Sequence, residues 1–209
     1  MFLPQCEDLS AICENRLESR STSVRYTSKE LARKGIRACA EGMLLLNGKW
    51  DFELIRGREN FPENIGDISF KNEISVPGVW QLQGYGQLQY TERRFPIPFD
   101  PPRIPDDTEV GCYRRQFILP ETFEGQSNIL RLEGVTCCHF VYVNQQYVGF
   151  SKGSHFVAEY DVSRFLKTGE NEIVILVYQY SDATYLEDQD MWRLSGIFRD
   201  VMLLSFPTE

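Results

Sequence analysis

The chain has little of the positive charge that a nucleic-acid-binding protein needs. Its 209 residues carry a net charge of −8, and its arginines and lysines are scattered or occur only in pairs. Without a basic stripe, the phosphates of a nucleic acid would be repelled. We therefore expect no nucleic acid partner.

Long apolar segments are also missing. No apolar run approaches the ~20 residues that a membrane-spanning helix requires. The N-terminus lacks the charged-then-apolar order of a secretory signal, because Glu7, Asp8 and Glu14 interrupt it. We expect a soluble cytoplasmic protein with no membrane partner.

The six cysteines do not form the pattern of a disulfide framework. Cys137 and Cys138 are adjacent, so in a strand they would point to opposite faces. No C-x-x-C pair suggests a zinc site. Reduced, buried thiols are the expected state.

Histidine is scarce, with only His139 and His155. His139 lies in an apolar segment and is expected to be structural, whereas His155 lies in a polar loop and is expected at the surface. No Ser–His–Asp pattern is present, so nucleophilic catalysis has no support.

What the sequence does contain is a series of short segments that alternate between apolar and polar residues. Trp50, Phe52 and Leu54 alternate with charged neighbours, which predicts a strand with one buried face. Trp50 and Trp80 are predicted core residues. Further strands are predicted over Cys112–Leu119, Asn128–Leu132 and Asn171–Tyr180. The last is apolar on nearly both faces and should be central.

Residues 140–143 and 147–149 flank the polar run Asn144-Gln145-Gln146, which is typical of a hairpin. Short strands with turn signals and almost no helical periodicity indicate an all-β, antiparallel β-sandwich over residues 46–209. The chain is long enough to bury roughly 70% of its unfolded surface.

Residues 1–45 are polar and are predicted to form an N-terminal arm that lies across a surface. Ser28 is a suitable cap for a short helix over Lys29–Lys34, and Gly35 is suited to end it. The five prolines between Phe95 and Pro105 exclude a central strand there. These prolines favour a rigid connecting segment over a ligand-binding loop.

Residues Tyr185–Asp200 form the most informative segment. Glu187, Asp188 and Asp190 crowd into four positions immediately before Met191, Trp192 and Arg193. Carboxylates accept strong hydrogen bonds from hydroxyl groups, and an indole covers the apolar patch of a sugar ring. The alternative is an acidic turn before a strand, in which Trp192 packs in the core; core packing is favoured for this tryptophan. Arg193 and Arg199 are expected to pair with acids such as Asp200.

Several segments in order resemble the N-terminal sugar-binding domain of β-galactosidases of glycoside hydrolase family 2. They are Asn15–Leu17, Leu46–Phe52, Val76–Gln81, Tyr90-Thr91, Phe95–Pro105, Gly111–Arg115, Gly149–Asp161, Glu170-Asn171 and the acidic segment. The resemblance implies the jelly-roll form of the sandwich, a galactoside substrate, and assembly into oligomers in the complete enzyme.

In that family both catalytic glutamates and a magnesium ion belong to a separate (β/α)₈ barrel, which alone takes ~250 residues. The resemblance therefore implies no catalytic residue in this chain and no hydrolysis by it alone. A barrel domain or partner polypeptide would supply the reactive groups. Glycoside hydrolysis needs two carboxyl groups flanking the bond, and one acidic loop cannot easily supply both.

The resemblance does imply ligand contacts. Asp190 matches the family aspartate that reaches the region of the sugar 6-hydroxyl and a bound sodium ion, whereas Glu187 and Asp188 are expected to hold loop backbone. Glu92 stands where better-known bacterial enzymes carry an asparagine that contacts galactose. This departure leaves the Glu92 contact open, because the added charge alters either the specificity or the loop.

Three functions remain open from the sequence. The chain is part of a β-galactosidase-like enzyme, a stand-alone carbohydrate-binding module, or a structural assembly domain whose acidic loop serves an interface.

Overall fold

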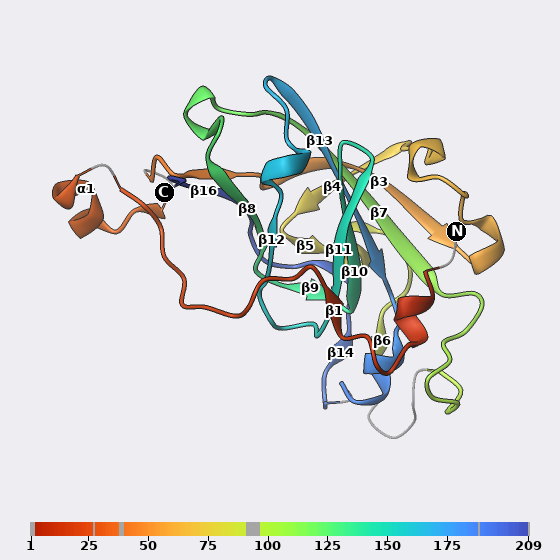
Figure 1. The fold of residues 1–209 in the computed structure, drawn as a ribbon. Helices are drawn as coiled ribbons and strands as arrows, with labels where there is room; N and C mark the ends of the chain where they lie inside the picture. Colours follow the sequence, from red (N-terminus) through yellow and green to blue (C-terminus); the bar gives the residue numbers. More distant parts are fainter. Residues whose placement is uncertain (1–2, 27, 38–39, 91–96, 188, 209) are drawn as a thin grey trace.

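The computed structural model describes residues 3–26, 28–37, 40–90, 97–187 and 189–208. Two antiparallel sheets pack face to face (Figure 1). The first, in spatial order, contains β1 (Cys13–Glu14), β11 (Gln146–Lys152), β10 (Cys138–Val143), β13 (Glu170–Tyr178), β7 (Glu109–Ile118), β3 (Gly48–Arg56) and β4 (Asn72–Val76). The second contains β12 (Ala158–Asp161), β8 (Ser127–Leu132), β16 (Val201–Phe206) and β2 (Met43–Leu45). The predicted all-β antiparallel sandwich is confirmed.

Shorter elements close the ends of the sandwich. Two small sheets are formed by β5 (Gly78–Val79), β15 (Gly196–Ile197) and β9 (Val135–Thr136), and by β6 (Gln89–Tyr90) and β14 (Trp192–Arg193). Single 3₁₀ turns occur at Pro4–Glu7, Arg58–Asn60, Ile65–Asp67, Trp80–Gln83, Glu121–Phe123, Ser163–Phe165 and Asp182–Tyr185. Among the described residues, no helix is both long enough and apolar enough to cross a bilayer.

Strand β13 is the middle strand of the large sheet and is buried on both faces. Ile173, Ile175 and Val177 pack in the core between the sheets, together with Leu130 and Leu203 of the second sheet. The alternating residues Val174, Leu176 and Tyr178 pack in a second core on the outer face. The sequence predicted this central place, because a strand covered on both sides must be apolar at every position.

The second core lies under segments that are not strands. Leu3 and Cys6 of the N-terminal arm enter it, together with Phe61, Ile68 and Ile104 from loops. The described part of the proline-rich segment is thus held against the sheet, which supports its role as a connector. Phe95 and Pro96 lie outside the described residues.

The predicted hairpin is present as β10 and β11. Its turn consists of Asn144 and Gln145, both with positive φ (48° and 65°), and Gln146 already pairs with Val143. Two residues with positive φ make the turn twist in the same sense as the strands.

The N-terminal arm lies along the sandwich, and it supplies an edge strand to each sheet, β1 to the first and β2 to the second. Its helix α1 (Lys29–Lys34) begins where Ser28 Oγ accepts from the Leu31 amide and ends at Gly35, with φ 63°. Strand β1 pairs with β11 at the sheet edge, and Arg20 forms an ion pair with the buried Glu159 (2.7 Å). In Figure 1, α1 lies apart from the sheets, on the side where the chain ends.

The described cysteines (Cys6, Cys13, Cys112, Cys137 and Cys138) are all free thiols. The expectation that Cys137 and Cys138 point to opposite faces of a strand is wrong. Only Cys138 lies in a strand, and both pack in the second core. Burial raises the pKa of the Cys137 thiol far above its usual value.

Candidate functional site

Asp190 lies in the loop that leaves the turn Asp182–Tyr185 and enters β14 at one end of the sandwich. The two-residue ladder between β14 and β6 places Trp192 opposite Tyr90 and Arg193 opposite Gln89. The Tyr180 hydroxyl donates to Gln89 Oε1 (2.7 Å), and this bond ties β6 to the end of the large sheet. The loop is thereby anchored to the sandwich.

The Asp190 side chain is exposed, and the hydroxyl of Tyr90 donates a hydrogen bond to its Oδ1 atom. Among the described residues, no second hydrogen bond or ion pair to this carboxylate is found. The bond to Asp190 raises the pKa of the Tyr90 phenol above its usual value, so the phenol remains a donor near neutral pH. Asp190 therefore presents one carboxylate oxygen outward.

Trp192 does not pack in the core, so the prediction for this residue is wrong. Its side chain is 54% exposed and lies beside Tyr90, with ring centroids 5.4 Å apart and an interplanar angle of 46°. The reason is that β14 belongs to a two-stranded sheet outside both cores. Trp50 and Trp80 are almost completely buried, as predicted. Tyr90 and Trp192 thus form an exposed aromatic pair beside Asp190, an arrangement suited to one face of a sugar ring.

The prediction for Glu187 is confirmed. Its carboxylate accepts from the backbone amide (2.8 Å) and the hydroxyl (2.5 Å) of Ser154 and holds two loops together. Arg193 donates to the Glu187 carbonyl oxygen (2.6 Å). Asp188 and Glu92 lie outside the described residues.

The predicted pairing of Arg199 with Asp200 is wrong. Arg199 donates to the carbonyl oxygens of Glu133 and His155, whereas Asp200 accepts from Asn47 and lies 3.9 Å from Arg37. Asp200 therefore helps to fix the N-terminal arm.

A cavity of about 420 Å³ lies beside Trp192, lined by both apolar and polar side chains. Met191 and Trp192 contribute to one part of its wall, and Val79, Leu194 and Phe198 to others. Cys137 also lines it, but the high pKa of this buried thiol excludes a thiolate nucleophile near neutral pH.

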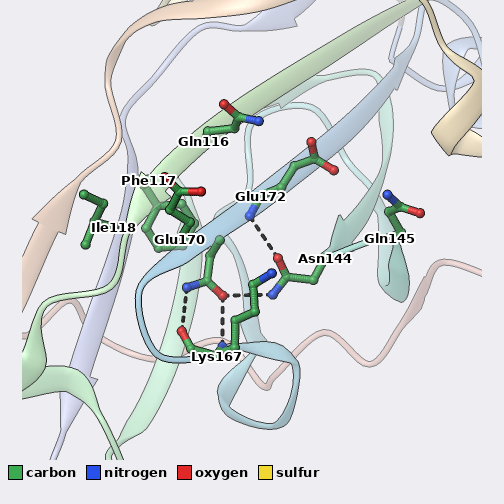
Figure 2. Close-up of a pocket in the computed structure, with 9 residues that line it drawn as sticks. Gln116, Phe117, Ile118, Asn144, Gln145, Lys167, Glu170 and Glu172 are labelled. Atoms are coloured by element: carbon green, nitrogen blue, oxygen red, sulfur yellow. Dashed lines mark hydrogen bonds between the residues drawn. The ribbon is translucent and has the colours of Figure 1, made fainter.

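A second hollow, of about 410 Å³, lies where β7 ends and β13 begins (Figure 2). The Asp190 loop follows the other end of β13. Asn171 accepts from the side chain of Asn144 (2.8 Å) and the amide of Lys167 (2.9 Å), and donates to the carbonyls of Lys167 and Gly169. Asn144 in turn accepts from the Glu172 amide (3.0 Å). These amides are occupied in holding the loops, so we regard this hollow as structural.

The two histidines lie in opposite environments. His139 is buried against Tyr160 and His155 is exposed, as predicted. In the described parts of the chain, no three His, Cys, Asp or Glu side chains are grouped closely enough to hold a metal ion. In the described part of the acidic loop, the exposed carboxylate of Asp190 is the group that can contribute to a site.

In the sequence analysis Asp190 was a candidate site residue, whereas Tyr90 was named only as part of a segment that resembles the family. The two residues are 100 positions apart. Their proximity could have been inferred only by pairing the short segment Gln89-Tyr90 with the segment Trp192-Arg193 as two strands.

Comparison with known proteins identifies relatives of the whole domain. The sequence matches the family model described as "Glycosyl hydrolases family 2, sugar binding domain" over residues 43–207. A β-galactosidase from Actinobacillus pleuropneumoniae is 40% identical over 205 residues, covering 98% of this chain and 20% of that protein. A β-galactosidase from Staphylococcus xylosus is 45% identical over 165 residues, 79% of this chain and 16% of that protein. The chain thus spans about a fifth or less of the length of these relatives.

Solved structures share the fold. A β-glucuronidase from Bacteroides uniformis superposes with a TM-score of 0.59 at 20% identity, covering 79% of this chain and 18% of that one. A β-glucuronidase from Bifidobacterium dentium, complexed with coumarin-3-O-glucuronide, superposes with a TM-score of 0.58 at 20% identity, covering 80% of this chain and 30% of that one. At this identity the likeness concerns the fold alone.

Proposed function

Since the chain belongs to the sugar-binding domain family of the family 2 glycosyl hydrolases, we propose that it is the N-terminal domain of a β-galactosidase-like enzyme. In this proposal Asp190 completes a galactoside site whose catalytic glutamates lie in a (β/α)₈ barrel on another part of the enzyme. The single observation that carries the proposal is the exposed carboxylate of Asp190 beside the aromatic pair Tyr90–Trp192. The β-galactosidase relatives support galactoside over other sugars.

Asp190 is proposed to bind both the sugar and a sodium ion. A hard cation prefers oxygen ligands, and the Oδ2 atom of Asp190 has no hydrogen bond or ion pair in the described part of the chain. One carboxylate oxygen is a partial donor set, so the remaining ligands would come from the barrel. A magnesium ion would likewise be held there. Glu92, which follows the strand of Tyr90, is kept as a second proposed sugar contact.

The wider setting is also proposed. Free thiols at every described cysteine support a reducing, cytoplasmic compartment. The arrangement of two antiparallel sheets supports the jelly-roll form of the sandwich. Assembly of the complete enzyme into an oligomer rests on the family alone.

The test is a chimera in which this chain replaces the matching N-terminal part of the A. pleuropneumoniae β-galactosidase. We expect hydrolysis of a chromogenic β-galactoside, and little hydrolysis of the matching β-glucuronide. Asp190→Ala should lower kcat/KM by about tenfold or more, since hydrogen bonds to charged groups contribute about 1.5–3 kcal/mol. Asp67→Ala, which removes an exposed carboxylate of the turn Ile65–Asp67, is the matched control. An active chimera indifferent to Asp190→Ala would refute the site.

The exposed aromatic pair favours one second candidate, a binding module that holds sugar without the barrel. Calorimetric titration of the chain with galactose or lactose separates the two functions. Saturable heat that is lost in Trp192→Ala would establish the module, whereas the enzyme-domain proposal expects little heat, because half of the pocket is absent.

A further inference from the structure

The carboxylate of Asp190 is held at one oxygen only. Tyr90 donates to Oδ1, and the described residues provide no hydrogen bond or ion pair to Oδ2. An exposed aspartate without such a partner would rotate freely, and ordering it on binding would cost conformational entropy. The tyrosine removes part of this cost in advance.

Three contacts hold Tyr90 and its strand in place. Its backbone pairs with Trp192, its ring lies against the Trp192 indole (centroids 5.4 Å apart), and its neighbour Gln89 is bound by the Tyr180 hydroxyl (2.7 Å). The position of the phenol is therefore set by the sandwich.

We propose that Tyr90 is the positioning residue of the Asp190 site. It fixes the carboxylate through Oδ1 and leaves Oδ2 as the single oxygen offered to a sodium ion or a sugar hydroxyl. This inference rests on the proposed function of Asp190. Residues that orient a ligand in this way typically change metal affinity by about 10–100-fold when they are removed.

The experiment is carried out in the chimera described above, with Tyr90→Phe, which keeps the ring beside Trp192 and removes only the hydroxyl. We expect the sodium concentration for half-maximal activity to rise about tenfold or more. Saturating sodium should restore most of the activity in Tyr90→Phe but not in Asp190→Ala. Tyr85→Phe is the matched control, because the Tyr85 hydroxyl donates to the backbone carbonyl of Glu73 (3.3 Å), outside this loop.

A second readout does not need activity. In the 209-residue chain, the NMR resonance of the Asp190 side-chain carboxyl carbon, measured at one neutral pH, should move in Tyr90→Phe and stay in place in Tyr85→Phe. The chemical shift of this carbon depends on the hydrogen bond from Tyr90 to Asp190. If Tyr90 only stabilised another part of the fold, the shift would not change.

The outcomes separate the two proposals. If Asp190→Ala disables the chimera while Tyr90→Phe keeps the wild-type sodium response, the positioning role is overturned and the site stands. If the chimera is active without Asp190, both proposals fall. An unmoved Asp190 resonance in Tyr90→Phe also overturns the positioning role.

Discussion

The hydroxyl oxygen of Tyr160 lies 3.0 Å from Nε2 of His139, and both side chains are buried in the large sandwich. Burial, together with a smaller contribution from the positive charge of Arg16, lowers the pKa of His139 to about 3. The folded protein therefore holds a neutral imidazole at this position near neutral pH.

The first prediction follows from this imidazole. The unfolded chain takes up a proton near the usual histidine pKa of about 6.5, whereas the folded chain does so only near 3. Between these values the unfolded state binds more protons, so stability decreases as the pH is lowered from about 6.5 toward 3, by up to about 1.4 kcal/mol per pH unit for this group. In His139→Gln the fall should be shallower. Urea unfolding of both proteins across this range is the measurement, and parallel curves would contradict it.

Trp80 is buried and Trp192 is exposed, so replacing each with alanine should change stability by different amounts. Trp80→Ala is expected to lower the free energy of unfolding by about 3–5 kcal/mol, because it empties a core position. Trp192→Ala should change it by about 0.5 kcal/mol or less, because surface substitutions usually do. In the chimera, however, Trp192→Ala should raise KM for the galactoside. A large loss of stability in Trp192→Ala would mean that the indole packs against the protein in solution.

These residues show why part of the fold could be predicted from the sequence. The central place of β13 follows from a local property, apolar residues at successive positions. The cap at Ser28 and the Asn144-Gln145 turn are also local, because each depends on neighbours a few positions away.

The errors concern contacts between distant segments. The same Trp-Arg pattern would suit a core strand, and only the pairing of β14 with β6 outside the cores makes Trp192 exposed. Asp200 binds Arg37 and Asn47, which no local pattern indicates. Asp190 was singled out through the family resemblance, whereas its hydrogen bond from Tyr90 depends on tertiary structure.

The third prediction concerns Asn171 at the far end of the sandwich. Its side chain makes four hydrogen bonds of 2.7–3.0 Å, so Asn171→Ala should lower the free energy of unfolding by about 2–4 kcal/mol, at about 1 kcal/mol per bond. Gln116→Ala, an exposed residue of the same hollow, should be nearly neutral. Comparison of the two urea midpoints is the measurement. Equal midpoints would mean that this network is not needed to hold the loops.

The last prediction concerns the ion pair between Lys152 and Asp182, whose charged groups are 2.8 Å apart with side chains only 6% and 3% exposed. Lys152 also donates to the carbonyl oxygen of Asp8 (2.9 Å), so it links the N-terminal arm to the turn before the Asp190 loop. Lys152→Met leaves the Asp182 carboxylate buried without its cation, and removal of one partner from such a pair costs about 3–5 kcal/mol.

The double variant Lys152→Met with Asp182→Asn leaves no uncompensated charge. It should therefore be more stable than Lys152→Met alone, although it has one more substitution. Urea unfolding of the wild type, both single variants and the double variant gives the coupling between the two positions. If the two losses simply add, the pair contributes no mutual stabilisation.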